Sequence, residues 1–234
     1  MICPTCKSSL FFLEKNKRNT MRCFRCGFKG KYIEPNYDGY HDERYSYKFI
    51  RNEANDPLVN KIVSSMNFVK DDYVLDYGCG AGDMTNTISN YSDHVTGVDI
   101  NITGAVSKFR KLNFKKQTGI KIDFLDNYFD KIVAVNVIEH VRDYNYLLNE
   151  FKRVLKPKGM IFITSYDKNF VLHKILNDPI HVIEWDLNEF EEIFKKDFII
   201  LKSFKYGSFF NYRPLNKIIV KILKPEICIL AVKS

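Results

Sequence analysis

The chain has 234 residues, of which 45% are hydrophobic and 27% charged, and its formal net charge is +8. This length allows one substantial domain with a small appendage, and the composition is that of a globular protein rather than a disordered one. No apolar run approaches the roughly 20 residues of a transmembrane helix, and the N-terminus lacks the pattern of a secretory signal, so we expect a cytoplasmic protein. The positive charge permits an anionic partner, although lysines scattered along the chain also account for it.

Residues 1–33 contain four cysteines in two Cys-x2-Cys pairs with sixteen residues between them: Cys3, Cys6, Cys23 and Cys26. Two such pairs can close a tetrahedral site of four thiolates, and residues 10–13 and 20–22 are expected to form a hairpin between them. We therefore predict a structural Zn²⁺ in a zinc ribbon. Iron in the same site and two disulfides are the alternatives.

Residues 34–57 are predicted to be a linker, and residues 58–234 alternate between helical and strand patterns. Helices are expected at 58–67, 83–88, 143–155 and 186–195, the last opened by a capping box of Asp186 and Glu189. Strands are expected at 73–77, 94–100, 129–137, 160–165, 198–204 and 227–232, with 121–125 a short strand or a loop and 156–159 a turn. This order predicts a doubly wound α/β fold with a parallel-rich sheet and a terminal antiparallel hairpin.

A glycine-rich loop follows the strand expected at 73–77. Asp76 stands near the end of this strand, and Gly78, Gly80 and Gly82 follow at alternate positions. Glycine adopts backbone angles that other residues resist and lets a ligand approach the main chain, so this loop predicts the nucleotide pocket of a doubly wound sheet. A dinucleotide fingerprint would require glycine at position 83, where Asp83 stands, and this indicates a different adenosine cofactor.

The pattern from Asp76 to Gly82 resembles motif I of the class I S-adenosylmethionine-dependent methyltransferases. Other segments match the family in order: 95–99, which ends in Asp99; 129–141, which ends in Glu-His-Val; the turn at 155–160; and 181–185. The last segment is similar to the small-molecule and ubiquinone-type subgroup. The resemblance covers about residues 58–234 and implies a seven-stranded Rossmann-like methyltransferase sheet.

The resemblance also implies a set of residues that bind S-adenosylmethionine: Asp76, Gly78, Cys79, Gly80, Gly82, Asp99, Ile100 and Asn136. In the family the acid at the position of Asp99 accepts both ribose hydroxyls, a task that suits an ionised carboxylate. The acid that usually contacts adenine has no counterpart here, because Gln117 and Thr118 stand where it is expected.

Three residues are candidates for catalysis: Glu139, His140 and His181. Some relatives bind a divalent metal through Glu-x-x-Glu-His, but Asn136 replaces the first acid here, and a hard cation is less favoured with fewer carboxylates. Packing and local pairing are the alternative roles of Glu139 and His140. Methyl transfer depends strongly on proximity and alignment, so the sequence need not contain a catalytic triad.

Three functions remain open at this point. A small-molecule O- or C-methyltransferase is favoured by the segments at 139–141 and 181–185. An rRNA or tRNA methyltransferase is favoured by the predicted ribbon, the basic charge and a similar layout in rRNA guanine methyltransferases with an N-terminal zinc finger; the ribbon would then contact phosphates. A non-catalytic zinc-ribbon protein is the third, and the intact glycine loop argues against it. Acceptor and oligomeric state are not specified by the sequence.

Overall fold

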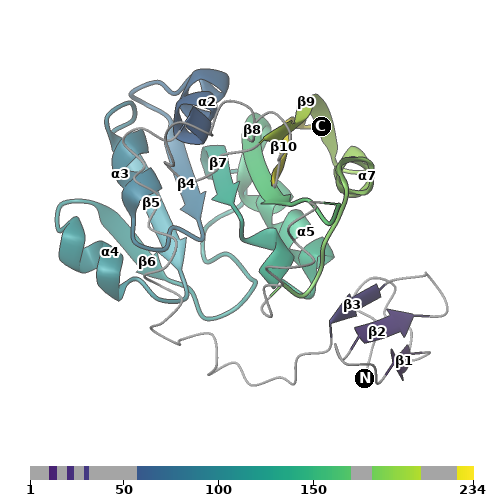
Figure 1. Ribbon diagram of the computed structural model, residues 1–234. Coiled ribbons are helices and arrows are strands. Elements are labelled where there is room, and N and C mark those ends of the chain that lie inside the picture. Colours follow the sequence, from purple (N-terminus) through teal and green to yellow (C-terminus); the bar gives the residue numbers. More distant parts are fainter. Residues whose placement is uncertain (1–10, 15–19, 24–28, 32–56, 170–180, 207–225) are drawn as a thin grey trace, which may run out of the picture.

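The computed structural model describes residues 11–14, 20–23, 29–31, 57–169, 181–206 and 226–234 (Figure 1). For the three N-terminal segments only the backbone is described. The predicted linker therefore lies outside the described residues except for Pro57. Among the helices described, none is long and apolar enough to cross a membrane.

The N-terminal segments form a three-stranded antiparallel sheet in the order β1-β2-β3. Its strands are β1 (Phe11–Glu14), β2 (Thr20–Cys23) and β3 (Lys29–Lys31). Phe11 pairs with Cys23 and Glu14 pairs with Thr20, so the predicted hairpin is confirmed. Three of the four predicted ligands, Cys3, Cys6 and Cys26, lie outside the described residues, and the zinc site remains a prediction.

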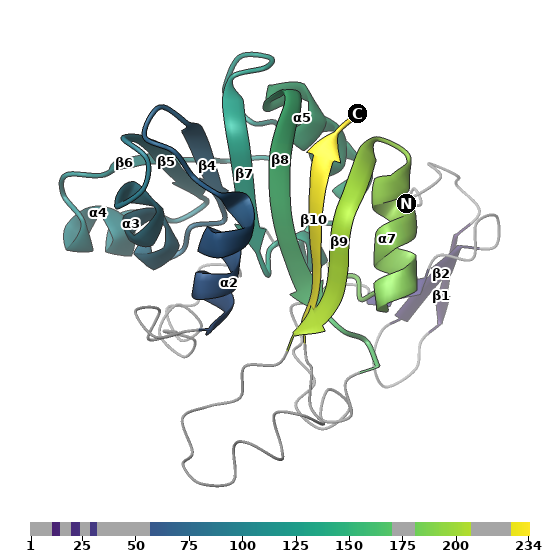
Figure 2. The same cartoon turned by 90° about the horizontal axis from the view of Figure 1, so that it is seen from above.

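The main sheet has seven strands in the order β6-β5-β4-β7-β8-β10-β9 (Figure 2). The strands from β6 to β8 run parallel, and β10 pairs antiparallel with both β8 and β9. The predicted α/β sheet and terminal hairpin are thus confirmed. The strands are β4 (Tyr73–Tyr77), β5 (His94–Asp99), β6 (Asn113–Lys116), β7 (Phe129–Val135), β8 (Leu155–Tyr166), β9 (Phe198–Tyr206) and β10 (Glu226–Lys233).

Helices cover both faces of this sheet, and successive strand residues alternate between two cores. In β4, Val74 packs into the core under α2 (Pro57–Met66) and α3 (Asp83–Ser89), whereas Leu75 packs into the core under α5 (Tyr144–Val154) and α7 (Leu187–Lys195). This period of two is the geometry of a strand. It explains why the central strands are apolar throughout, since both of their faces are buried.

Side-chain caps define where α5 and α7 begin. The Asp143 carboxylate accepts the Tyr146 N–H, and Asp186 and Glu189 form the predicted capping box in full. Each cap satisfies N–H groups that have no partner inside the helix, a contribution of about 1 kcal/mol.

The third parallel strand is β6, and residues 121–125 have no regular structure, so the loop is the correct one of the two alternatives expected there. The sequence Asn-Phe-Lys-Lys of β6 gives little strand signal, because an edge strand with exposed side chains does not need an apolar run. Helix α4 (Thr103–Lys108) was also not predicted. Both elements lie at the edge of the sheet, where burial imposes the least pattern on the sequence.

The expected turn at 156–159 is absorbed into β8 as a bulge. Leu155 pairs with Phe129 and Met160 pairs with Lys131, so the four residues between them protrude from the ladder. Lys158 in this bulge has a φ of +63°, a left-handed conformation that favours glycine.

Candidate active site

The glycine loop follows β4 at the carboxyl edge of the parallel strands, and its three glycines have φ values of +77°, +50° and +84°. A Cβ at Gly78 would lie 2.1 Å from Val137 Cγ2, and one at Gly82 would lie 2.7 Å from Phe114 Cζ. A Cβ at Gly80 would meet nothing within 4 Å. Packing therefore requires glycine at both ends of the loop, while its middle faces open space.

Asp99 ties this loop to the end of β5. Its Oδ2 accepts the Gly80 N–H at 2.9 Å, and its Oδ1 accepts the Asn101 N–H at 3.0 Å. The Val98 carbonyl accepts the N–H groups of Gly78 and Cys79 at 2.8 and 3.0 Å. Each carboxylate oxygen can accept a second hydrogen bond, so Asp99 can receive hydroxyl donors while it still holds the loop.

Asp76 lies beneath the loop with 3% of its surface exposed, and its Oδ2 accepts the Thr85 hydroxyl at 2.6 Å. Burial raises the pKa of Asp76 to about 7, and the negative charge of Asp99 adds to the effect. Burial also raises the pKa of the Cys79 thiol, with contributions from both carboxylates. Cys79 is therefore a protonated, buried thiol and not a nucleophile.

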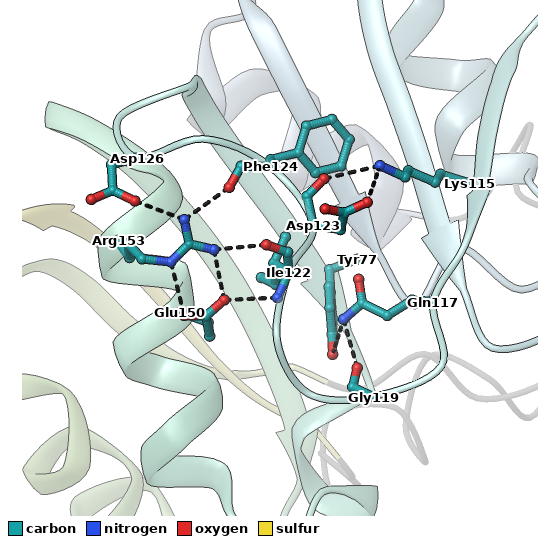
Figure 3. Close-up of polar contacts among 10 residues, drawn as sticks. All are labelled: Tyr77, Lys115, Gln117, Gly119, Ile122, Asp123, Phe124, Asp126, Glu150 and Arg153. Carbon is teal, nitrogen blue, oxygen red and sulfur yellow. Dashed lines mark hydrogen bonds and ion pairs between the residues drawn. The ribbon is translucent and has the colours of Figure 1, made fainter.

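Gln117 lies at the carboxyl end of β6, beside the loop. Its N–H donates to the Asp99 carbonyl at 2.8 Å, and its Nε2 donates to Tyr77 Oη at 3.3 Å and to the Gly119 carbonyl at 2.8 Å (Figure 3). These two hydrogen bonds from Nε2 hold the side chain in one orientation. Gln117 and Thr118 were the two positions expected near adenine, and Gln117 is the one whose side chain is held in place beside Asp99.

Arg153 and Glu150, which the sequence analysis did not single out, hold the loop that precedes β7 against α5 (Figure 3). The Arg153 guanidinium donates to the carbonyls of Ile122 and Phe124 at 2.7 and 2.8 Å. It also contacts both Glu150 oxygens, at 2.8 and 2.7 Å, and Glu150 Oε2 accepts the Ile122 N–H at 2.7 Å. The hydrogen bond from Arg153 lowers the pKa of Glu150. The spacing of Glu and Arg at i and i+3 on α5 was the available signal.

The three catalytic candidates come together at the carboxyl edge, where His181 joins Glu139 and His140 from 41 residues further along the chain. Glu139 and His140 lie on a 3-10 helix, η3 (Ile138–His140), and potential ligand atoms of Glu139, His140 and His181 all lie within 4.8 Å of one another. Glu139 is fully buried and His181 is 3% exposed. The imidazole rings of His140 and His181 have centroids 5.1 Å apart.

Backbone hydrogen bonds and an aromatic contact fix the position of His181. The N–H groups of Val182 and Ile183 donate to the Glu139 carbonyl at 2.9 and 3.2 Å. The Tyr166 ring, at the end of β8, lies 4.8 Å from the His181 ring. A carboxylate with two imidazoles can accept a proton from an acceptor and pass it on, and the same three groups offer ligands to a divalent cation.

Asn136 stands between β7 and this cluster with a φ of +53°. Its Oδ1 accepts the Thr164 hydroxyl at 2.9 Å, and its Nδ2 donates to Glu226 Oε1 at 3.1 Å. The side-chain amide therefore links β7 to β8 and β10.

Comparison with known proteins agrees with this geometry. Residues 75–163 match a family described as a methyltransferase domain. An uncharacterized protein of Methanocaldococcus jannaschii is 27% identical over 188 residues, which cover 74% of this chain and 81% of that protein. A ubiquinone biosynthesis O-methyltransferase of Rickettsia bellii is 31% identical over 119 residues, or 47% of this chain and 49% of that enzyme. The chain thus spans about half the length of the ubiquinone enzyme it matches.

Solved structures share the fold. A chain from the complex between the Haloferax volcanii Trm112 methyltransferase activator and a methyltransferase has a TM-score of 0.64 at 16% identity, covering 75% of this chain and 87% of that one. A SAM-dependent methyltransferase of Methanosarcina mazei has a TM-score of 0.60 at 22% identity, covering 74% and 96%. At these identities the likeness concerns the fold alone.

The strand order and the glycine loop agree with the match of residues 75–163 to a methyltransferase domain. These findings support an S-adenosylmethionine-dependent methyltransferase activity, and the methyl acceptor is a separate question.

Proposed function

We propose that the chain transfers the methyl group of S-adenosylmethionine to an oxygen or carbon nucleophile of a small molecule. The observation that carries the proposal is the cluster of Glu139, His140 and His181 at the carboxyl edge of the sheet. Val137 connects this cluster to the glycine loop, because its side chain packs against Gly78 and η3 begins at the next residue. An acceptor held between them would meet both the methyl donor and a proton acceptor.

In this proposal, different residues of the site bind different parts of the cofactor. Asp99 receives the ribose hydroxyls, and the side chain of Ile100, which is 37% exposed, offers an apolar surface beside it. The open backbone at Gly80 receives the methionine end, with Asp76 and Cys79 buried as support. The Oε1 of Gln117 is suited to accept the adenine amino group. Asn136 contributes by fixing the backbone where β7 ends.

His140 or His181 removes the acceptor's proton in this proposal, and Glu139 orients the imidazoles. His140→Asn or His181→Asn should lower kcat by about 100-fold or more, with S-adenosylmethionine affinity unchanged. The matched control is His94→Asn, since His94 is exposed at the amino end of β5. If both cluster variants keep the activity of this control, the proton-transfer role is wrong.

Transfer of a labelled methyl group into a metabolite extract, compared with transfer into purified RNA, tests the acceptor class. We expect label in a small molecule, and label confined to RNA would refute the small-molecule acceptor. Activity should survive extensive chelation if the cluster moves protons without a cation. Loss on chelation with recovery on adding Mg²⁺, which four thiolates do not bind, would assign a metal to the cluster instead.

We also propose that Cys3, Cys6, Cys23 and Cys26 bind one structural zinc. The support is the spacing of the cysteines and the three-stranded sheet that lies between and after the pairs. Metal analysis of the reduced full-length protein should give about one zinc per chain. A Cys23→Ser variant should lose it, whereas Cys228→Ser, a buried cysteine on β10, should not. Zinc retained by Cys23→Ser would contradict the assignment.

A further inference from the structure

One edge of the main sheet carries a basic stretch. Residues 100–122 contain no acidic residue and six basic ones, all of them exposed: Lys108, Arg110, Lys111, Lys115, Lys116 and Lys121. This stretch forms α4, the following turn, edge strand β6 and the start of the next loop. Figure 2 shows α4 and β6 at the opposite end of the sheet from β9. We call these six residues the basic edge.

Most of this charge is not neutralised by ion pairs with the described residues. Lys108 pairs with Asp83, and Lys115 pairs with Asp123 at 2.6 Å. The other four, Arg110, Lys111, Lys116 and Lys121, make no ion pair with any residue that the structure describes. Four exposed cations on one edge repel one another in the folded chain, and an anionic partner would relieve this repulsion.

The basic edge follows the direction of β6 and ends beside the glycine loop. Arg110 and Lys111 precede the amino end of β6, and Lys116 at its carboxyl end pairs in register with Asp99. Lys121 continues into the next loop. The charges are thus spread along a line and do not converge into one pocket, which suits a polymer with repeated phosphates better than a single phosphorylated metabolite.

We infer that the basic edge binds the phosphate backbone of RNA and places the polymer beside the methyl donor. A membrane surface is less well matched, because α4 has only six residues and is too short to lie as an amphipathic helix among lipid headgroups. The inference goes beyond the proposed function and does not depend on the identity of the acceptor. RNA bound here would be the support near which the small acceptor of the proposed function is modified.

The test is the salt dependence of RNA binding by the full-length protein. Labelled single-stranded RNA of mixed sequence is titrated at about 50 to 200 mM salt, where counterion release dominates affinity. Arg110→Glu/Lys111→Glu should raise Kd at least about tenfold and reduce the slope of log K against log salt by about 1.4, since each phosphate that is no longer neutralised accounts for about 0.7. Neither residue contacts the glycine loop, so S-adenosylmethionine affinity should be unchanged and reports that the domain is folded.

The matched control reverses the charge of two exposed lysines elsewhere on the domain, in the variant Lys158→Glu/Lys196→Glu. Lys158 lies in the β8 bulge and Lys196 lies just before β9, so both are at the amino ends of those strands. Both also lie outside a second stretch without acidic residues, 198–225, much of which the structure does not describe. The control should change Kd by less than about twofold. Equal losses in both double variants would show that only net charge matters and would overturn the inference. So would an unchanged slope in Arg110→Glu/Lys111→Glu, or binding to anionic vesicles in place of RNA.

Discussion

The two ends and the middle of the glycine loop should respond differently to the same added methyl group. Gly78 and Gly80 both have positive φ, so alanine at either position costs about 1 kcal/mol of backbone strain. At Gly78 the new Cβ would also lie 2.1 Å from Val137 Cγ2, and this overpacking costs a further 1–3 kcal/mol or so. The Cβ at Gly80 meets open space. We expect Gly78→Ala to lower the free energy of unfolding by about 3 kcal/mol and Gly80→Ala by about 1 kcal/mol.

Urea unfolding followed by the far-ultraviolet signal measures both losses, and calorimetry with S-adenosylmethionine measures the effect on binding. Gly80→Ala should weaken cofactor binding despite its smaller effect on stability, because the open position is where a ligand approaches the backbone. Val137→Ala provides a double-mutant cycle with Gly78→Ala. If overpacking is the cause, the double variant should recover at least about 1 kcal/mol relative to the sum of the single losses. Equal losses at the two glycines, or a coupling near zero, would refute the steric explanation.

Three further predictions concern charge and strain in the methyltransferase domain. Asp76 has a folded pKa of about 7, raised from 3.8, so the native state binds more protons than the unfolded state between these values and stability falls as pH rises from about 4 to 7. Urea titrations at several pH values should show a fall on the order of 4 kcal/mol that is absent in Asp76→Asn; parallel profiles for the two proteins would contradict the assignment. Glu150→Ala should cost about 2–3 kcal/mol, because Arg153 and the Ile122 N–H lose their acceptor, and it should increase hydrogen exchange at Ile122; normal protection there would contradict this role. Lys158→Gly should be neutral or stabilise by up to about 1 kcal/mol in thermal unfolding, since it removes left-handed strain at an exposed site, and a clear loss would contradict it.

The parts of the fold that could be predicted from sequence are those in which burial dictates a pattern. Strands β4, β7 and β10 are apolar because helices cover both faces of the sheet, and the cap of α7 depends only on residues three positions apart. Strand β6 could not be predicted, because its neighbour lies on one side only and three of its four side chains are exposed. The bulge in β8 was expected as a turn, because residues 156–159 read Lys-Pro-Lys-Gly and the left-handed position is occupied by Lys158 and not by glycine.

The candidate site divides in the same way. The glycine loop is local in sequence, so Asp76 and the three glycines could be recognised together, whereas the roles of Glu150 and Arg153 follow from a loop that no local pattern reveals. The proximity of His181 to His140 results from pairing between the backbone of Val182 and Glu139, contacts that span 43 residues. Sequence reasoning could name these histidines only as separate candidates.

Val137 lies between the two halves of the site. Its side chain fills the space that Gly78 leaves, and its backbone immediately precedes η3, which carries Glu139 and His140. Any movement of the glycine loop when S-adenosylmethionine binds must therefore either displace Val137 or compress it, and packed side chains transmit such strain. Replacement of Val137 by alanine removes this contact without touching a proposed catalytic group. If loop and cluster are coupled, the variant should alter kcat more than cofactor affinity, whereas an equal loss in both would mean that Val137 serves the fold alone.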